Sequence, residues 1–237
     1  MTVLTMIQEH CRRSKLPVPG AAASSNDPQA AQLFALMNEL LEDLVTRKLW
    51  QQNTRETVHT SLAQEDQGNI TTLSPGFVEI VRDSFYNRTT NLRIHYGLQP
   101  PEWQLRKITG AATGSSYWAR LRENKLLFSP APPAGQTIAW EYRSEYFVKD
   151  ADTQALKELF TKDGDTFILP ERIGRLWLRW RWKHEKGLDY AQEFAFYESQ
   201  IELFSQRDNG PRVADMGRTD PDIVTPGIVI PEGNWDL

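Results

Sequence analysis

Cysteine is nearly absent from this sequence, since Cys11 is the single one among 237 residues. One cysteine excludes an internal disulfide and a thiolate metal site, and it is compatible with a reducing compartment. The plainer interpretation of Cys11 is a small buried apolar residue. The chain also lacks any run of about 18 apolar residues, which excludes a membrane-spanning helix. Because residues 1–10 lack a basic segment followed by a long apolar one, we expect no secretory signal.

Motifs that carry known chemistry are missing as well. The sequence has no G-x-S-x-G motif, no phosphate-binding loop and no H-x-x-x-H pair among His10, His59, His95 and His184. The glycine-bearing stretch 110–116 is interpreted as a turn. The carboxylates of Glu65, Asp66, Asp163 and Asp165 lie in polar turns and are interpreted as solvated. The sequence therefore predicts no catalytic residue, no metal site, no cofactor and no enzymatic activity.

The charge is nearly balanced, with 27 Lys and Arg against 31 Asp and Glu and a net charge of -4. This mild acidity argues against a general nucleic-acid binder. Aromatic residues are the prominent component, with 8 Trp, 7 Tyr and 10 Phe. Such side chains suit both cores and interfaces, and a chain of this length can bury a substantial core.

Helical periodicity occurs near both ends of the chain. Helices are predicted over residues 2–14, from Asp27-Pro28 to about 50, from Pro170 to about 186, and from Asp189 to about 207. The first should bury one face, made of Val3, Met6, Ile7, His10 and Cys11. The last two, joined at Gly187, should form an antiparallel hairpin.

The middle of the chain favours strands and turns. Strands are predicted within residues 54–62, 77–82, 92–96, 117–128 and 137–148. Residues 64–69 are predicted to be a polar turn, residues 100–108 a short helix, and residues 152–160 either a short helix or an ordered loop.

These patterns predict an α+β fold. Residues 1–53 and 150–207 should form a bundle of about four helices, with a small antiparallel β-rich insertion over 54–149. Residues 208–237, with four prolines and four glycines, are predicted to be an extended C-terminal arm that docks on a partner. The candidate docking residues of this arm are Ile223, Val224, Ile228, Val229, Ile230 and Trp235.

The third predicted helix carries a basic stripe formed by Arg172, Arg175, Arg179 and Lys186, with Arg181 and Lys183 nearby. One interpretation is contact with nucleic acid or an acidic partner. The favoured one is an exposed face paired with acids of the last helix, such as Glu193, Glu198 and Glu202.

Three tryptophans on this helix point to a second surface. At about 100° per residue, Trp177, Trp180 and Trp182 cannot all face one core, so at least one should face another surface, for example a second subunit. The candidate subunit-interface residues are Trp177, Trp182, Arg175 and Arg179.

The order and spacing of several segments resemble the head-to-tail adaptor (connector) proteins of short-tailed bacteriophages, over roughly residues 3–207. These segments are Ser24–Gln29, Lys48–Gln52, Phe85–Thr90, Pro101–Gln104, Phe167–Glu171 and Leu176–Tyr190. Their order carries the resemblance, because no single one is chemically diagnostic.

The resemblance implies a structural virion protein at the head–tail interface, made in the host cytoplasm. It implies a ring, typically of twelve copies, with the portal protein above, the tail nozzle protein below and DNA passing through the lumen without specific binding. Residues 208–237 are then the portal-binding arm, and an acidic wall suits passing DNA because like charges repel. Two alternatives stay open: a virion-associated cell-wall hydrolase, and a DNA-binding regulator that uses the basic stripe.

Overall fold

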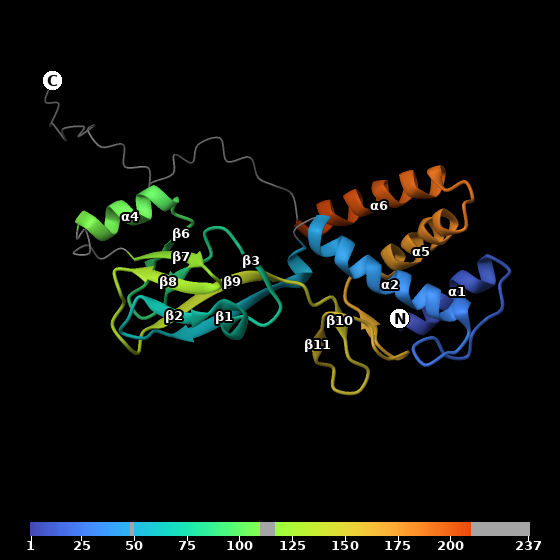
Figure 1. The fold of residues 1–237 in the computed structure, drawn as a ribbon, viewed down its shortest axis with the longest axis horizontal. Helices are drawn as coiled ribbons and strands as arrows, with labels where there is room; N and C mark the ends of the chain where they lie inside the picture. Colours follow the sequence, from blue (N-terminus) through green and yellow to red (C-terminus); the bar gives the residue numbers. More distant parts are fainter. Residues whose placement is uncertain (48–49, 110–116, 210–237) are drawn as a thin grey trace, which may run out of the picture.

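The computed structural model describes residues 1–47, 50–109 and 117–209 (Figure 1). Four longer helices lie together with the N-terminus at one end, and most strands lie at the other (Figure 1). The helices are α1 (Val3–Arg13), α2 (Pro28–Arg47), α5 (Glu171–Glu185) and α6 (Ala191–Asn209). The shorter ones are η1 (Gln51–Asn53), α3 (Ile70–Leu73) and α4 (Pro100–Thr109).

Local capping explains where the first two long helices begin. The backbone amide of Thr5 donates to the Thr2 hydroxyl at 3.3 Å, at the start of α1. The backbone amide of Gln29 donates to the Asp27 carboxylate at 3.1 Å, at the start of α2. Serine, threonine and aspartate stabilise helix starts in this way, so both predicted starts are confirmed. The face predicted to be buried in α1 is buried.

The α5–α6 hairpin is also confirmed. Gly187 adopts φ +68°, a left-handed conformation that ends helices and that glycine accepts without steric cost. Its amide donates to the His184 carbonyl at 3.0 Å, and the amide of Leu188 donates to the Lys183 carbonyl at 2.9 Å. The Asp189 carboxylate then accepts from the amide of Ala191 at 3.2 Å, where α6 begins.

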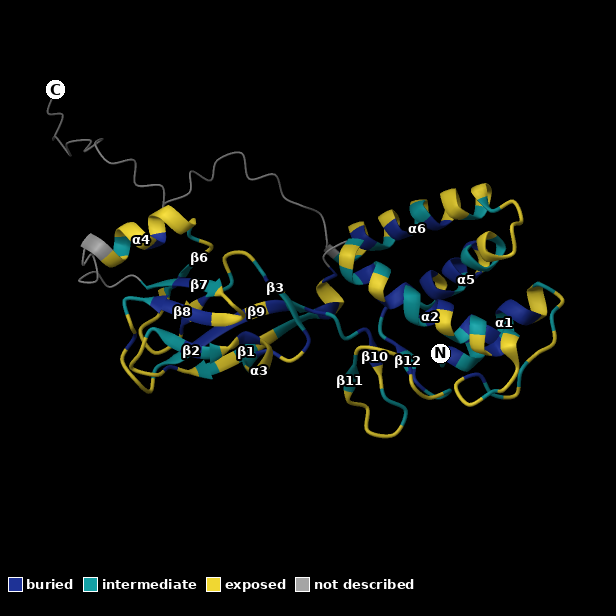
Figure 2. Ribbon diagram, viewed as in Figure 1, coloured by how far each residue is buried: buried dark blue, intermediate teal, exposed yellow. Residues whose placement is uncertain are grey.

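The four long helices share one hydrophobic core, and their buried positions turn toward one another (Figure 2). Gly174 lets α5 approach α1 and α2 closely, because a Cβ there would lie 3.0 Å from the Met6 sulfur and 3.2 Å from the Met37 methyl. Trp177 crosses from α5 to α2, where its indole N–H donates to the Leu36 carbonyl at 2.7 Å. Trp177 thus links α5 to α2 inside this core.

The strands of the described residues form three sheets. The five-stranded sheet holds β1 (Thr54–Thr60), β3 (Phe77–Ile80), β4 (Tyr86–Asn87), β5 (Leu92–Arg93) and β9 (Thr137–Ser144). The four-stranded sheet holds β2 (Asp66–Asn69), β6 (His95–Tyr96), β7 (Trp118–Arg122) and β8 (Lys125–Ser129). The smallest holds β10 (Val148–Lys149), β11 (Leu156–Lys157) and β12 (Thr166–Phe167).

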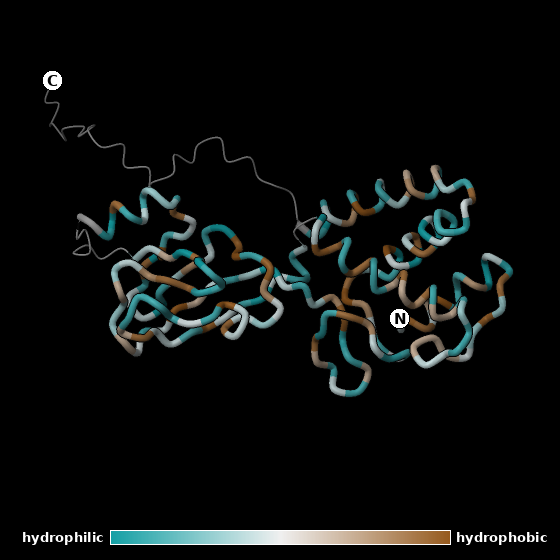
Figure 3. Tube along the Cα trace, viewed as in Figure 1, coloured by the Kyte–Doolittle hydropathy of each residue, from teal (hydrophilic) through white to brown (hydrophobic). Residues whose placement is uncertain are grey.

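The two larger sheets enclose a second core, and hydrophobic segments of the chain converge there as they do among the helices (Figure 3). Trp140 on β9 is fully buried and stacks on Phe85, with ring centroids 5.0 Å apart. The smallest sheet belongs to the helical core instead, because Val148 and Phe167 are buried in it.

The prediction of a helical bundle with a small antiparallel β-region is therefore wrong, although the α+β class is right. The described strands make three sheets, and β6 pairs with β7 in parallel. The predicted turn at residues 64–69 contains β2, where the buried side-chain amide of Gln67 donates to the backbone carbonyl of Leu62 at 3.0 Å. Residues 152–160 contain β11 and no helix. The sequence did not predict these strands, because β11 has only two residues and β2 is polar, so neither shows an alternation of hydrophobic and polar residues.

One predicted turn carboxylate is buried rather than solvated. Asp165 is 0% exposed and accepts from the amides of Thr161 and Lys162 at 2.7 and 2.8 Å. It also accepts from the amide of Ala151 at 3.1 Å and pairs with the Lys157 ammonium at 2.6 Å. Burial alone raises the pKa of this carboxyl, but the bonds from Lys157 and the three amides outweigh burial and lower it.

Candidate interaction surface

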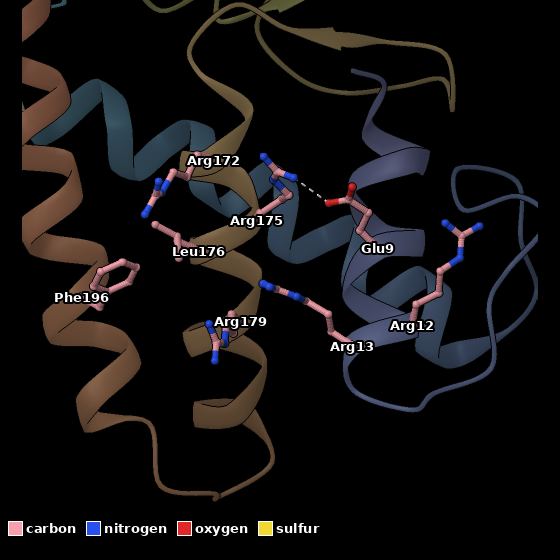
Figure 4. Close-up of a pocket in the computed structure, with 8 residues that line it drawn as sticks. All are labelled: Glu9, Arg12, Arg13, Arg172, Arg175, Leu176, Arg179 and Phe196. Atoms are coloured by element: carbon pink, nitrogen blue, oxygen red, sulfur yellow. Dashed lines mark hydrogen bonds and ion pairs between the residues drawn. The ribbon is translucent and has the colours of Figure 1, made fainter.

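Three adjoining hollows, which share lining residues, lie along α5 against α1 and α6, and Figure 4 shows one of them. We call them together the α5 groove. Its cationic side chains outnumber its carboxylates. The cationic ones are Arg12, Arg13, Arg172, Arg175, Arg179, Lys183 and Arg207, and the carboxylates are Glu9, Glu171 and Glu193. The apolar lining is Leu176, Trp182, Leu188, Phe196, Leu203 and Phe204.

The helical repeat places the arginines of α5 in one row, because residues three and four apart share a helix face. Arg175 pairs with Glu9 of α1 at 3.0 Å, as the dashed line in Figure 4 marks. Arg179 lies 3.9 Å from Glu193 of α6, which also pairs with Lys183. The hydrogen bond from Lys183 lowers the pKa of Glu193. The row thus faces acids on both walls of the groove.

The predicted pairing of the basic stripe with the last helix is therefore right for Glu193 and incomplete elsewhere. Glu198 pairs with Arg47 of α2 instead. Arg181, on another side of α5, pairs with Glu39 of α2 at 2.7 Å. Helix α1, whose part in this network was not anticipated, supplies the partner of Arg175.

Positive charge remains in the groove after these pairs. Within residues 1–47, 50–109 and 117–209, no carboxylate pairs with Arg12, Arg13 or Arg172. Arg172 lies over the ring of Phe196 instead, with its guanidinium carbon 5.7 Å from the ring centroid. Arg13 extends from α1 toward α5, where Arg175 and Arg179 lie (Figure 4). Guanidinium groups gathered in a hollow attract carboxylates and phosphates.

The arginines of α1 were missed because sequence reasoning treated the first helix as a core element. The available signal was the pair Arg12-Arg13 in the last turn of an amphipathic helix, outside its buried face. That signal does not say which element the pair faces. Only the packing of α1 against α5 brings Arg13 beside the basic stripe, whereas the side chain of Arg12 points away from α5 (Figure 4).

The candidate subunit-interface residues separate into two places. Trp182, Arg175 and Arg179 line the α5 groove, whereas Trp177 is 3% exposed and lies in the core. Trp180 is buried beside Trp177, with ring centroids 4.9 Å apart. Trp182 is half-buried, and its ring centroid lies 5.5 Å from that of His10 of α1. The role of these residues in subunit contacts stays a prediction.

A buried titratable side chain, that of His10, lines the groove. His10 of α1 is 6% exposed, and desolvation together with the charge of Arg179 lowers its pKa to about 4. The imidazole is therefore neutral near pH 7. It lines the groove together with Ser14 and Trp182.

Several predicted features fall outside the described residues. These are the arm residues Ile223, Val224, Ile228, Val229, Ile230 and Trp235, and the glycine-bearing stretch 110–116. Of the residues that the structure does describe, no three His, Cys, Asp or Glu are placed to hold a metal ion. Nor is any helix in that part of the chain long and apolar enough to cross a membrane.

The family model of the SU10 adaptor protein matches residues 1–219. The chain therefore belongs to this family and is a phage structural adaptor protein located in the virion. No curated protein matches the sequence. The match supports the resemblance to phage adaptors at this level, while membership of the connectors of short-tailed phages stays a prediction.

Proposed function

We propose that this chain is a head-to-tail adaptor that forms a ring between the portal vertex and the tail nozzle and lines the channel through which DNA leaves. The observation that supports the proposal is the family match, which spans residues 1–219 and so includes every described residue. An adaptor needs surfaces for its neighbours rather than a reaction centre. The α5 groove is such a surface.

Within this proposal, copies meet laterally at the α5 groove. Trp182, Arg175 and Arg179 supply an aromatic and charged contact, the residue types enriched in interfaces. A ring of twelve copies follows from the resemblance to connectors. The net charge of -4 per chain favours a lumen wall that repels passing DNA.

Residues 208–237 form the portal-binding arm of this proposal, beside a helical unit (1–53 and 150–207) and a β-rich unit (54–149). The start of the arm is anchored, since the Asp208 carboxylate accepts hydrogen bonds from the amides of Gln51 and Gln52. Helix α6 continues to Asn209. A truncated variant that removes the arm and keeps the helix intact therefore ends at Asn209.

Electron microscopy of the virion tests the proposal. A ring of this protein between head and tail is the expected result, located by an antibody fragment or by fitting the helical and β-rich parts into the map. Finding the protein in tail fibres, or in the capsid shell alone, would overturn the proposal. A parallel assay on peptidoglycan addresses the hydrolase alternative, and turnover lost in single Asp or Glu variants would contradict a purely structural role.

A further inference from the structure

The α5 groove combines unneutralised positive charge with an apolar wall. The charge comes from Arg13 and Arg172, which have no carboxylate partner in the described part of the chain. The apolar wall comes from α6, where Phe196 and Leu203 are 43% and 45% exposed. The groove therefore fits a ligand that carries both carboxylates and apolar side chains.

The last residues of this chain have that composition. Residues 220–237 contain Asp220, Asp222, Glu232 and Asp236 and no lysine or arginine. Between these acids lie the apolar side chains Ile223, Val224, Ile228, Val229 and Ile230. This stretch also lies beyond the residues that the family model matches, which end at 219.

Residues 220–237 are close enough in the sequence to α6 to reach the α5 groove of their own chain. Helix α6, with 19 residues, is about 28 Å long. Residues 210–219 span up to about 35 Å when extended, so residue 220 can reach either end of the groove. A tether of this length holds the segment at a millimolar effective concentration, which favours its own groove over that of a second copy.

We propose that, in the free protein, residues 220–237 bind in the α5 groove of the same chain. The carboxylates pair with the groove arginines, and the apolar side chains pack on Phe196 and Leu203. This docking does not depend on the adaptor function proposed above. In an adaptor it has a consequence, because a portal that captures the arm uncovers Arg175, Arg179 and Trp182 for the next subunit.

Photo-crosslinking in the full chain tests the docking. Benzoylphenylalanine replaces Ile228, the dilute protein is irradiated, and the linked peptides are mapped by mass spectrometry. The expected products join position 228 to groove residues of α1, α5 and α6. Products concentrated on the β-rich part, or no product, would overturn the proposal. Mixing isotopically labelled and unlabelled chains checks the connectivity, and products that join two copies would overturn the same-chain assignment.

Charge reversal supplies the matched comparison. The groove variant is R172E/R175E/R179E, and the control is R82E/R120E/R122E, which changes the net charge equally but alters arginines outside the groove. Loss of three ion pairs should lower the crosslink yield about tenfold in the groove variant. The control should keep the wild-type yield. Equal yields in the two variants would contradict docking.

A second variant, in the segment itself, controls for misfolding of the groove variant. D220N/D222N/E232Q/D236N alters no described residue and removes the acids of the segment. It should lose crosslinking to the groove to the same extent, and thermal melts confirm that the fold is kept. A wild-type yield in this variant would overturn the electrostatic basis of the proposal.

Discussion

The imidazole of His10 packs edge-on against the indole of Trp182, with ring centroids 5.5 Å apart and ring planes at 65°. This contact joins α1 to α5 below the arginines of the groove. The imidazole is neutral near pH 7, since burial and the nearby Arg179 disfavour the charged form and lower its pKa. The stability of the α1–α5 packing should therefore depend on pH.

The direction of that dependence follows from the two pKa values of His10. The folded-state pKa is about 4, below the ordinary histidine value of 6.5 that we take for the unfolded chain. Between these values the unfolded chain binds more protons, so stability falls as the pH is lowered from about 6.5 to about 4. The contribution lost is about 3 kcal/mol at most. Urea unfolding at several pH values measures it.

The variant His10→Phe keeps an aromatic ring against Trp182 and removes the titrating group. Its free energy of unfolding should fall less between pH 7 and pH 4 than that of the wild type. The control is His184→Phe, since the side chain of His184 is 42% exposed. An unchanged pH dependence in His10→Phe would refute the role of His10.

Gly174 offers a test of the close helix packing. The substitution Gly174→Val places methyl groups where Met6 and Met37 already lie within 3.2 Å of a Cβ. Overpacking of this kind should lower the free energy of unfolding by about 1–3 kcal/mol. The control is Gly20→Val, because no atom lies within 4 Å of a Cβ at Gly20. Similar melting temperatures for the two variants would argue against tight packing at Gly174.

Asp165 should be essential for the loop that carries β11 and β12. Asp165→Asn removes the charge that pairs with Lys157 and turns an amide group toward backbone donors, so we expect a loss of about 3–5 kcal/mol. The matched control is Asp152→Asn, whose side chain is 75% exposed and pairs with Lys162. That change should cost less than about 1 kcal/mol. Chemical denaturation of both variants compares them.

Removal of the arm tests its proposed role in attachment. A chain that ends at Asn209 keeps the Asp208 bonds to η1 and should retain the wild-type far-UV circular dichroism spectrum. It should no longer sediment with portal rings. A chain that ends at Thr219 shows whether the final 18 residues are responsible for binding to portal rings. Undiminished sedimentation of the chain that ends at Asn209 would rule out the arm as the attachment.

Much of the local structure could be predicted from the sequence. Thr2 and Asp27 cap the first two helices as expected, and Gly187 ends α5 as expected. These features depend on residues within four positions of one another, and each has one physical cause, such as a free amide to satisfy or a left-handed turn to adopt. The α+β class and the phage adaptor resemblance also came from the sequence.

The tertiary structure decided the rest. Gln67 lies in a strand because a neighbouring strand and nearby carbonyls satisfy it, and Asp165 is buried because three amides and Lys157 converge on it. Arg13 and Arg175 are 162 positions apart in the sequence, yet they line one groove. Periodicity reports which face of a helix is apolar, but not which helix meets it. The packing of side chains from distant segments determines which helices meet, and here it places α1 and α6 beside the basic stripe of α5, where they form the groove.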